Sequence, residues 1–348
     1  MKIYLILLFI IFFCSINKNT YERYYTYFKP FELQTLIEPI NTYIQDLYTF
    51  STYTENINFT KELIKLLLTN TKLMNLKLEL PNKNIFTITN NILTRLNNNN
   101  IQFSILPVPL IYPVTNNYPN IRSLINISET SFYMIYNSKK FGRKNLRLKD
   151  FVLNETTIFG TTDKYTLSYK ITDFFLKNIN KQIPNYKIIT KDFDVLINEL
   201  LNEKLNIITF LDGNPSRKLE SILNNDPDNK IYIQELGLDI FDINEKYDYI
   251  YNEVYIKYKK PSKLYPNNKY RTLSFNNTLL TNNYVSDKIV FIIIKFILEH
   301  KNFLNKKLDG YNISNLDEFL PLYSFISHRE IHKIFNNLKQ LEPIDYDM

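Results

Sequence analysis

Residues Leu205–Arg217 read Leu-Asn-Ile-Ile-Thr-Phe-Leu-Asp-Gly-Asn-Pro-Ser-Arg, a pattern that indicates a strand, a turn and the start of a helix. Its first part, Leu205–Leu211, is a short apolar run with the composition of a buried strand. Turn residues end the run, and Pro215 stands where a following helix would have its first position. A strand that leads through a glycine turn into a helix leaves free backbone N–H groups for an anionic or polar solute. We therefore interpret this stretch as one wall of a ligand cleft.

A second stretch of the same kind lies upstream. Residues Thr157–Thr166 contain a short strand, a glycine and a hydroxyl-rich turn, and the helical run Leu167–Lys177 follows. Either turn alone is weak evidence, but two of them in one α/β unit are what a small-molecule cleft requires.

Strands and helices alternate along most of the chain, which predicts an α/β fold with largely parallel sheets. Residues 17–55 are rich in tyrosine and end with helical spacing through Leu36, Ile40, Ile44 and Leu47. The other expected helices are 59–69, 88–96, 167–177, 193–201, 286–302 and 327–341, and the expected strands are 76–80, 102–107, 121–127, 132–136, 157–159, 186–190, 205–211 and 231–233.

Composition limits the classes of function. The chain has 348 residues, 45% of them hydrophobic and 15% aromatic, so two ordinary domains with real cores are expected and global disorder is not. The net charge of +7 is spread thinly, with small basic clusters at 138–144 and 257–260, so we expect no nucleic-acid partner. Alanine is absent and residues with AT-rich codons are abundant, so our hypothesis for the source is a giant virus or an AT-rich microbe.

The N-terminus resembles an export signal. Residues 1–16 carry one early charge, Lys2, and Ile3–Cys14 is an uncharged run that is too short to span a bilayer. We expect either a cleaved signal peptide or an uncleaved membrane anchor, and in both cases a secreted or otherwise extracytoplasmic chain. Five sequons permit glycosylation, although an asparagine-rich chain contains such triplets by chance: Asn58, Asn126, Asn154, Asn276 and Asn312.

The residues that enzymes and metal sites use are scarce. Cys14 is the one cysteine, so a disulfide within the chain and a cysteine-based metal site are excluded. His328 and His332 have the spacing to share a helix face, but no acidic third ligand stands out. No nucleophilic triad, paired carboxylate motif or phosphate-binding glycine loop is present. We therefore expect no enzyme, no cofactor and no metal.

Four segments carry a family resemblance. Leu148–Phe151 with the following strand and the turn Gly160–Thr166, and Asn198–Ser216, resemble segments of type II periplasmic solute-binding proteins. Tyr265–Asp287 and Ser327–Phe335 resemble that family's later strand, its valine-rich helix and its last helix start. Together they resemble the TAXI branch of TRAP-transporter solute receptors over about residues 55–340.

The resemblance implies a two-lobed, type II periplasmic-binding-protein-like (Venus flytrap) fold after the signal or anchor at 1–16. Lobe 1 would comprise residues 30–137 and 262–348, and lobe 2 residues 138–261. The implied function is binding of a small polar solute, such as an amino acid or a carboxylate, between lobes that close about a hinge. A membrane partner would follow from the transporter relationship.

The turns and strand ends supply the candidate ligand-binding residues: Asn90, Asn91, Ser104, Thr161, Thr162, Thr166, Asp212, Gly213 and Asn214. Each of these residue types also caps helices and closes turns without any ligand. The family's first-lobe glycine turn would fall at Thr87–Asn91, which has no glycine, and Lys164 and Tyr165 could fill the solute space. Asp212 would repel a carboxylate unless a cation such as Lys164 balances it, which favours an amine-bearing solute or none. The alternative function is therefore a solute-binding fold that has lost its ligand and serves as a structural or interaction protein on a virion or cell surface.

Overall fold

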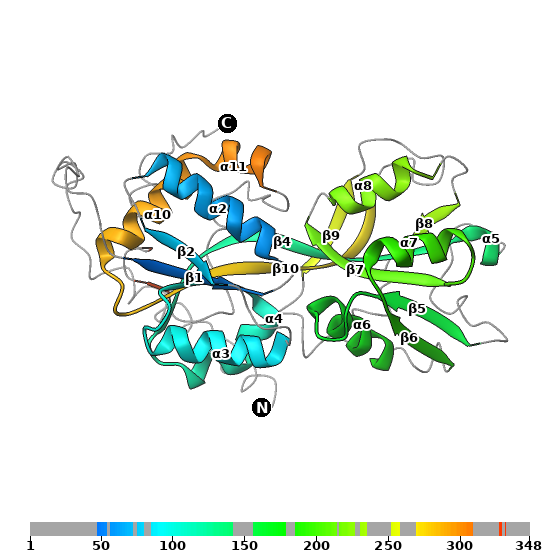
Figure 1. Ribbon diagram of the computed structural model, residues 1–348, viewed down its shortest axis with the longest axis horizontal. Coiled ribbons are helices and arrows are strands. Elements are labelled where there is room, and N and C mark those ends of the chain that lie inside the picture. The colour runs from blue at the N-terminus through cyan, green and yellow to red at the C-terminus, as the bar shows by residue number, and fades with distance from the viewer. Residues whose placement is uncertain are drawn as a thin grey trace, which may run out of the picture. The chain divides into compact units, whose positions relative to one another are not determined.

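The computed structural model describes residues 47–53, 56–71, 75–79, 85–141, 156–178, 185–213, 216–226, 230–234, 252–257, 269–308, 327–328 and 331. All of them belong to one compact unit, residues 44–348 (Figure 1). The expected signal or anchor and most of the predicted helix up to Leu47 lie outside the described residues. None of the helices within the described ranges is long and apolar enough to cross a membrane.

In the described ranges, a ten-stranded sheet organises the unit. Its strands follow the order β2-β1-β3-β10-β4-β7-β5-β6, and β8 and β9 pair in addition with β4 and β10. The strands are β1 (Tyr48–Thr52), β2 (Leu76–Glu79), β3 (Phe103–Pro107), β4 (Ile121–Asn137), β5 (Thr157–Thr161), β6 (Tyr186–Thr190), β7 (Ile207–Gly213), β8 (Ile231–Ile233), β9 (Asn252–Lys257) and β10 (Lys269–Asn282).

Two long strands, β4 and β10, belong to both halves of this sheet. The first part of β4 pairs with the second part of β10, which continues through β3 into β1 and β2. The last part of β4 pairs with β7 and β8, and the first part of β10 pairs with β9. The sheet therefore has two halves, β1–β3 and β5–β8, that β4 and β10 join (Figure 1).

The register of these strands brings the carboxyl ends of both halves together. Pro107, the last residue of β3, lies beside Asn277 of β10, and Asn277 lies beside Ser128 of β4. Gly213, the last residue of β7, lies beside Thr130 of β4. Because β3 runs parallel to β4 and β7 runs antiparallel to it, strands from the two halves end facing each other near the middle of β4.

Helices cover both faces of each half. Buried side chains of α2, α10 and α11 pack on one face of the first half, and those of α7 and α8 on one face of the second. A further cluster is shared by α3, α4 and α6 on the remaining faces (Figure 1). The helices are α2 (Ile57–Asn70), α3 (Ile85–Asn97), α4 (Val108–Ile111), α5 (Ser138–Phe141), α6 (Leu167–Asn178), α7 (Phe193–Leu201), α8 (Arg217–Asn224), α10 (Asp287–Glu299) and α11 (Lys301–Lys307), with a 3-10 turn at Tyr112–Asn117.

An ion pair fastens the outer strand β2 to α3. Both terminal nitrogens of Arg95 donate to the Glu79 carboxylate, each at 2.7 Å. These hydrogen bonds lower the pKa of Glu79. Because the pKa is lowered in the fold, the pair stabilises the protein at neutral pH, and its contribution is lost as the pH falls through the pKa of the folded state.

Most expected elements are present, but several differ from the expectation. The sheet is mixed rather than largely parallel, because β4 and β10 run antiparallel to every strand they pair with. The predicted strands 121–127 and 132–136 are one strand, and the predicted helix 286–302 is divided into α10 and α11. Residues 48–52, for which no strand was expected, form β1 in the centre of the first half. Pro215 lies outside the described residues, and α8 begins at Arg217 with Ser216 as its N-cap.

Gly160 has a packing role. It lies inside β5 and not in the turn after it, and a Cβ at this position would lie 2.7 Å from Leu196 Cδ2 and 2.9 Å from Leu205 Cδ1. The absence of a side chain therefore lets α7 and the segment before β7 lie close on β5.

We expect Gly160→Ala to lower the free energy of unfolding by about 1–3 kcal/mol, since the added methyl group overpacks this contact. Urea denaturation measures the loss, and Val195→Ala on the exposed side of α7 is the control, with an expected change within about 0.5 kcal/mol. In a Leu196→Ala background the cost of the alanine should shrink, because the nearest clashing methyl group is gone. Strictly additive costs would contradict this explanation.

Candidate functional site

Polar residues are concentrated where the two halves of the sheet meet. Residues 126–131 of β4 read Asn-Ile-Ser-Glu-Thr-Ser, and residues 274–278 of β10 read Ser-Phe-Asn-Asn-Thr. β4 is largely apolar on either side of its segment, as expected of a central strand, whereas β10 has Arg271 and Thr272 before its segment and Leu279 and Leu280 after it. A polar interruption in the buried centre of a sheet has a desolvation cost, so it requires internal partners or a ligand.

Asn277 is the centre of a buried network in this segment. It is 1% exposed, and its amide nitrogen donates to Ser128 Oγ at 2.9 Å and to Thr130 Oγ1 at 2.8 Å. Its amide oxygen accepts a hydrogen bond from the hydroxyl of Tyr53, the residue after β1, at 2.8 Å. Asn277 therefore ties the carboxyl end of β1 to the centre of β4.

Three neighbouring strands place polar residues side by side next to this network. Ser274 of β10 lies opposite Ser131 of β4, which lies opposite Asp212 of β7. All three are on the α8 side of the sheet, because they alternate with residues that face the other cluster. We call Ser274, Ser131 and Asp212 the polar row.

The two hydroxyls of the polar row are buried without a hydrogen-bond partner in the described structure. Ser131 and Ser274 are both 0% exposed. A buried hydroxyl that lacks a partner costs about 1–3 kcal/mol, and native proteins contain few such groups. Two of them on facing residues are therefore a feature that requires an explanation.

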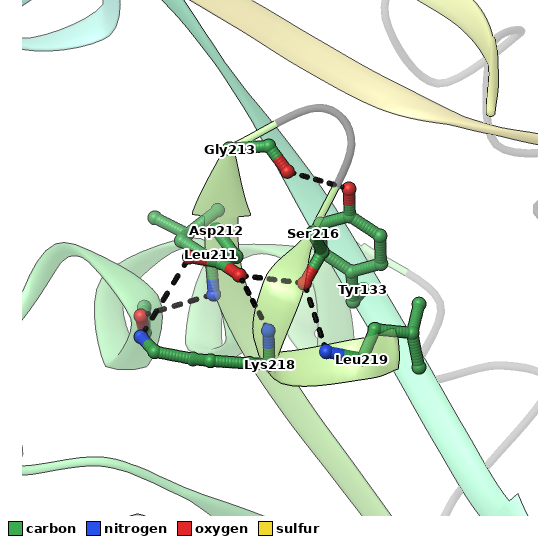
Figure 2. Close-up of polar contacts among 8 residues, drawn as sticks. Tyr133, Leu211, Asp212, Gly213, Ser216, Lys218 and Leu219 are labelled. Atoms are coloured by element: carbon green, nitrogen blue, oxygen red, sulfur yellow. Dashed lines mark hydrogen bonds and ion pairs between the residues drawn. The ribbon is translucent and has the colours of Figure 1, made fainter. Parts of the chain in front are cut away.

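Asp212 serves first as a cap for α8. Its Oδ2 accepts hydrogen bonds from Ser216 Oγ at 2.6 Å and from the Lys218 backbone N–H at 3.3 Å, and Ser216 Oγ accepts one from the Leu219 N–H at 3.0 Å. Lys218 Nζ lies 3.8 Å from Asp212 Oδ1. Figure 2 shows this arrangement, with the Tyr133 hydroxyl donating to the Gly213 carbonyl at 2.8 Å. Two N–H groups that we expected to be free for a solute thus have partners within the protein, and the cation beside Asp212 is Lys218 rather than Lys164.

The turn before α6 is also partly satisfied from within. Thr166 Oγ1 donates to the Asp163 carbonyl and accepts a bond from the Tyr169 N–H at 3.3 Å, which caps α6. Thr162 Oγ1 lies 3.0 Å from Thr166 Oγ1. Thr161 differs, since its hydroxyl is 0% exposed and has no partner in the described structure. Thr161 shares the α6 side of β5 with Phe159, so it lies on the opposite face from the polar row.

The other predicted residues lie apart from this cluster. Asn90 and Asn91 are exposed on α3, and Ser104 is buried within β3, where its hydroxyl donates to the Ser51 carbonyl at 2.9 Å. Asn214 lies outside the described residues. Lys164 and Tyr165 are exposed and contact each other, with Lys164 Nζ 4.9 Å from the Tyr165 ring centroid.

The structure describes only one of the two histidines that have the spacing to share a helix face. His328 is 5% exposed, and its Nε2 lies 3.8 Å from Asp287 Oδ1, whereas His332 lies outside the described residues. Within the described ranges, no group of three or more potential metal ligands is close enough to hold a metal ion.

Sequence reasoning missed the residues of the network and of the polar row other than Asp212. One strand was predicted to end at Ile127 and the next to begin at Phe132, so the polar residues between them were assigned to no strand. The register that brings Ser131 beside Ser274 and Asp212 joins segments that are far apart in the sequence.

We expect Ser216→Ala to lower the free energy of unfolding by about 1 kcal/mol, because α8 loses its N-cap hydrogen bond and Asp212 loses a donor. The midpoint of urea denaturation measures this change. Ser221→Ala on the exposed side of α8 is the control and should leave the midpoint nearly unchanged. Equal midpoints for the two variants would show that the cap is not formed.

We expect Tyr53→Phe to cost about 1–2 kcal/mol, because Asn277 Oδ1 would stay buried without its donor. Tyr165→Phe, which removes an exposed hydroxyl, should cost less than about 0.5 kcal/mol. Thermal and urea denaturation distinguish the two, and a Tyr53→Phe variant as stable as the parent would contradict the network.

Comparisons with known proteins found the following similarities. The structure resembles a periplasmic transporter (TM-score 0.49, 9% identity, 86% of this chain and 94% of that one). It also resembles the binding-protein component of an ABC phosphonate transporter from Pseudomonas aeruginosa (TM-score 0.45, 12% identity, 79% of this chain and 83% of that one). A third similar structure is the open second substrate-binding domain of GlnP from Lactococcus lactis (TM-score 0.43, 11% identity, 79% of this chain and 98% of that one).

The predicted two-lobed, type II periplasmic-binding-protein-like α/β fold is confirmed. No curated protein matches the sequence significantly. The model of the NMT1-like family matches residues 111–328, which is more than half of the chain and includes β4, the second half of the sheet and β10. The chain therefore belongs to the NMT1-like family.

Proposed function

We propose that this protein is exported and binds a small polar solute between its two lobes, which close around it. The observation that carries the proposal is the meeting of the carboxyl ends of β3 and β7 at the polar centre of β4. In α/β sheets, ligands bind beyond the carboxyl ends of strands, where chain direction changes. Here two such ends face each other, and the buried polar groups between them have more hydrogen-bonding capacity than the protein itself uses.

The hinge of the proposed closure lies in β4 and β10. From the family resemblance we propose the lobes as residues 30–137 with 262–348, and 138–261. We place the bending point inside the first of these lobes, within Ser128–Ser131 and Ser274–Asn277, so that the last part of β4 and the first part of β10 would move with the second lobe, whose strands β7 and β8 pair with β4. Hinges are a few residues that absorb the change in backbone angles, and closure gains binding energy only when solute contacts both lobes. Small side chains such as serine would allow that bending at little steric cost.

The remaining parts of the proposal follow from the leader and the family resemblance. Residues 1–16 would direct the chain out of the cytosol, either as a cleaved signal or as an anchor. A membrane partner of the TRAP-transporter type, as in the TAXI branch, would receive the solute. We propose a binding protein and not an enzyme, because the described site has no arrangement of nucleophile, base and orienting acid.

The alternative function is a scaffold that keeps the fold without a ligand. It is favoured by the turns at 162–166 and 212–216, whose hydroxyls and several of whose N–H groups are used in capping α6 and α8. Such a protein would present its surface to a partner on a virion or a cell.

A thermal-shift screen of the purified full chain separates the two functions. If the site is competent, at least one solute among sugars, polyols, amino acids, dicarboxylates and 2-oxo acids should raise the melting temperature by mass action. At a concentration of 100 Kd such a solute adds about 2.7 kcal/mol to the free energy of unfolding. Small-angle scattering with the active solute should then show a smaller radius of gyration. If no member of the panel raises the melting temperature, solute binding is contradicted and the scaffold function is favoured. N-terminal sequencing of the exported product tests cleavage of the leader.

A further inference from the structure

We infer that the solute contacts the polar row, Ser274, Ser131 and Asp212, and that it is an uncharged, hydroxyl-bearing compound such as a sugar or a polyol. This inference rests on the proposed function, since it names the class of solute that the same site takes.

The geometry of the polar row suits a single small ligand. The three residues lie on adjacent strands in direct register, where facing side chains have Cβ atoms about 4.5–5.5 Å apart. They lie on one face of the sheet, next to the place where the strand ends of both halves meet. One compact molecule can therefore reach residues on strands that belong to both lobes.

The unpartnered groups of the row are alcohols. Ser131 Oγ and Ser274 Oγ are fully buried and have no hydrogen-bond partner in the described structure. Each hydroxyl can donate one hydrogen bond and accept others, so each is complementary to another hydroxyl in either direction. Sugar and polyol hydroxyls have this dual character, whereas a carboxylate only accepts.

The surroundings oppose a carboxylate. Asp212 already uses the Ser216 hydroxyl and the Lys218 N–H at the start of α8, which are donors that an anion would need. Its own negative charge would face a bound anion at short range. Among the residues whose burial the structure describes, no lysine or arginine is buried, so none is present there to compensate an anion.

An ammonium group on the solute is also less suited to the polar row than a hydroxyl. The charge of Asp212 is already balanced by Lys218 Nζ at 3.8 Å and by the N-terminal end of α8. Asp212 can still accept a hydrogen bond from a neutral donor, because each carboxylate oxygen has two lone pairs.

Access to the row requires the lobes to open. Both serine residues are 0% exposed, so a solute reaches their hydroxyls only if the strands separate or bend where the two halves of the sheet meet. Binding at this position is therefore coupled to the hinge within Ser128–Ser131 and Ser274–Asn277.

The test uses the full chain and two panels at equal concentrations, one of neutral sugars and polyols and one of dicarboxylates, 2-oxo acids and amino acids. We expect a member of the first panel to raise the melting temperature and to bind measurably in calorimetry, and the second panel to have no effect. Ser131→Ala and Ser274→Ala should each weaken that binding about tenfold. Without solute, both variants should be as stable as the parent or slightly more so, because each removes an unpartnered polar group.

Ser51→Ala is the matched control, since Ser51 is a buried serine of β1 outside the row and should leave the affinity unchanged. Stabilisation by the charged panel alone would overturn the inference and leave the proposed function intact. If no member of either panel raised the melting temperature, both this inference and the proposed function would be overturned. Binding of a sugar or polyol with unchanged affinity in both row variants would overturn the assignment of the row.

Discussion

The antiparallel pairing of β4 with β10 is the interaction on which the rest of the structure depends. Nine residue pairs connect Ile121–Ser131 of β4 with Ser274–Asn282 of β10, and every other strand joins the sheet directly or indirectly through these two. Each of the two strands is long enough to serve both halves of the sheet. Their shared register also places the ends of β3 and β7 opposite each other, so the position of the candidate site follows from the same pairing.

The local elements were largely predictable from the sequence, because their apolar spacing is regular. The helix α7 and the strand β8 have the expected bounds, and α10 lies within the helix expected at 286–302. The long strands were not predictable in the same way. β4 was divided in two because its centre is polar, and β10 was missed as a long strand for the same reason, since strand patterns are defined by apolar residues.

The candidate site was predictable only as a location. Thr161 and Asp212 were found because they follow buried strands, which is a local signal. Their actual contacts depend on tertiary structure, since Asp212 caps α8 while Thr161 has a buried hydroxyl without a described partner. Ser131 and Ser274 could not be identified as site residues from the local sequence, because the environment of a serine in a strand depends on the strands that pair with it.

The register between β4 and β10 has two irregularities, at Asn277/Thr278 and at Leu279/Leu280, and at each one β4 contributes an extra residue, Ile127 and Leu124. Ile125, Ile127 and the extra residue Leu124 all pack in the cluster under α2 and α10, whereas Ile121 packs in the cluster on the opposite face. Leu124 therefore changes which face of the sheet the start of β4 presents to each cluster. Its loss would turn the side chains before it to the wrong face, so packing on both faces fixes the number of residues in this part of β4.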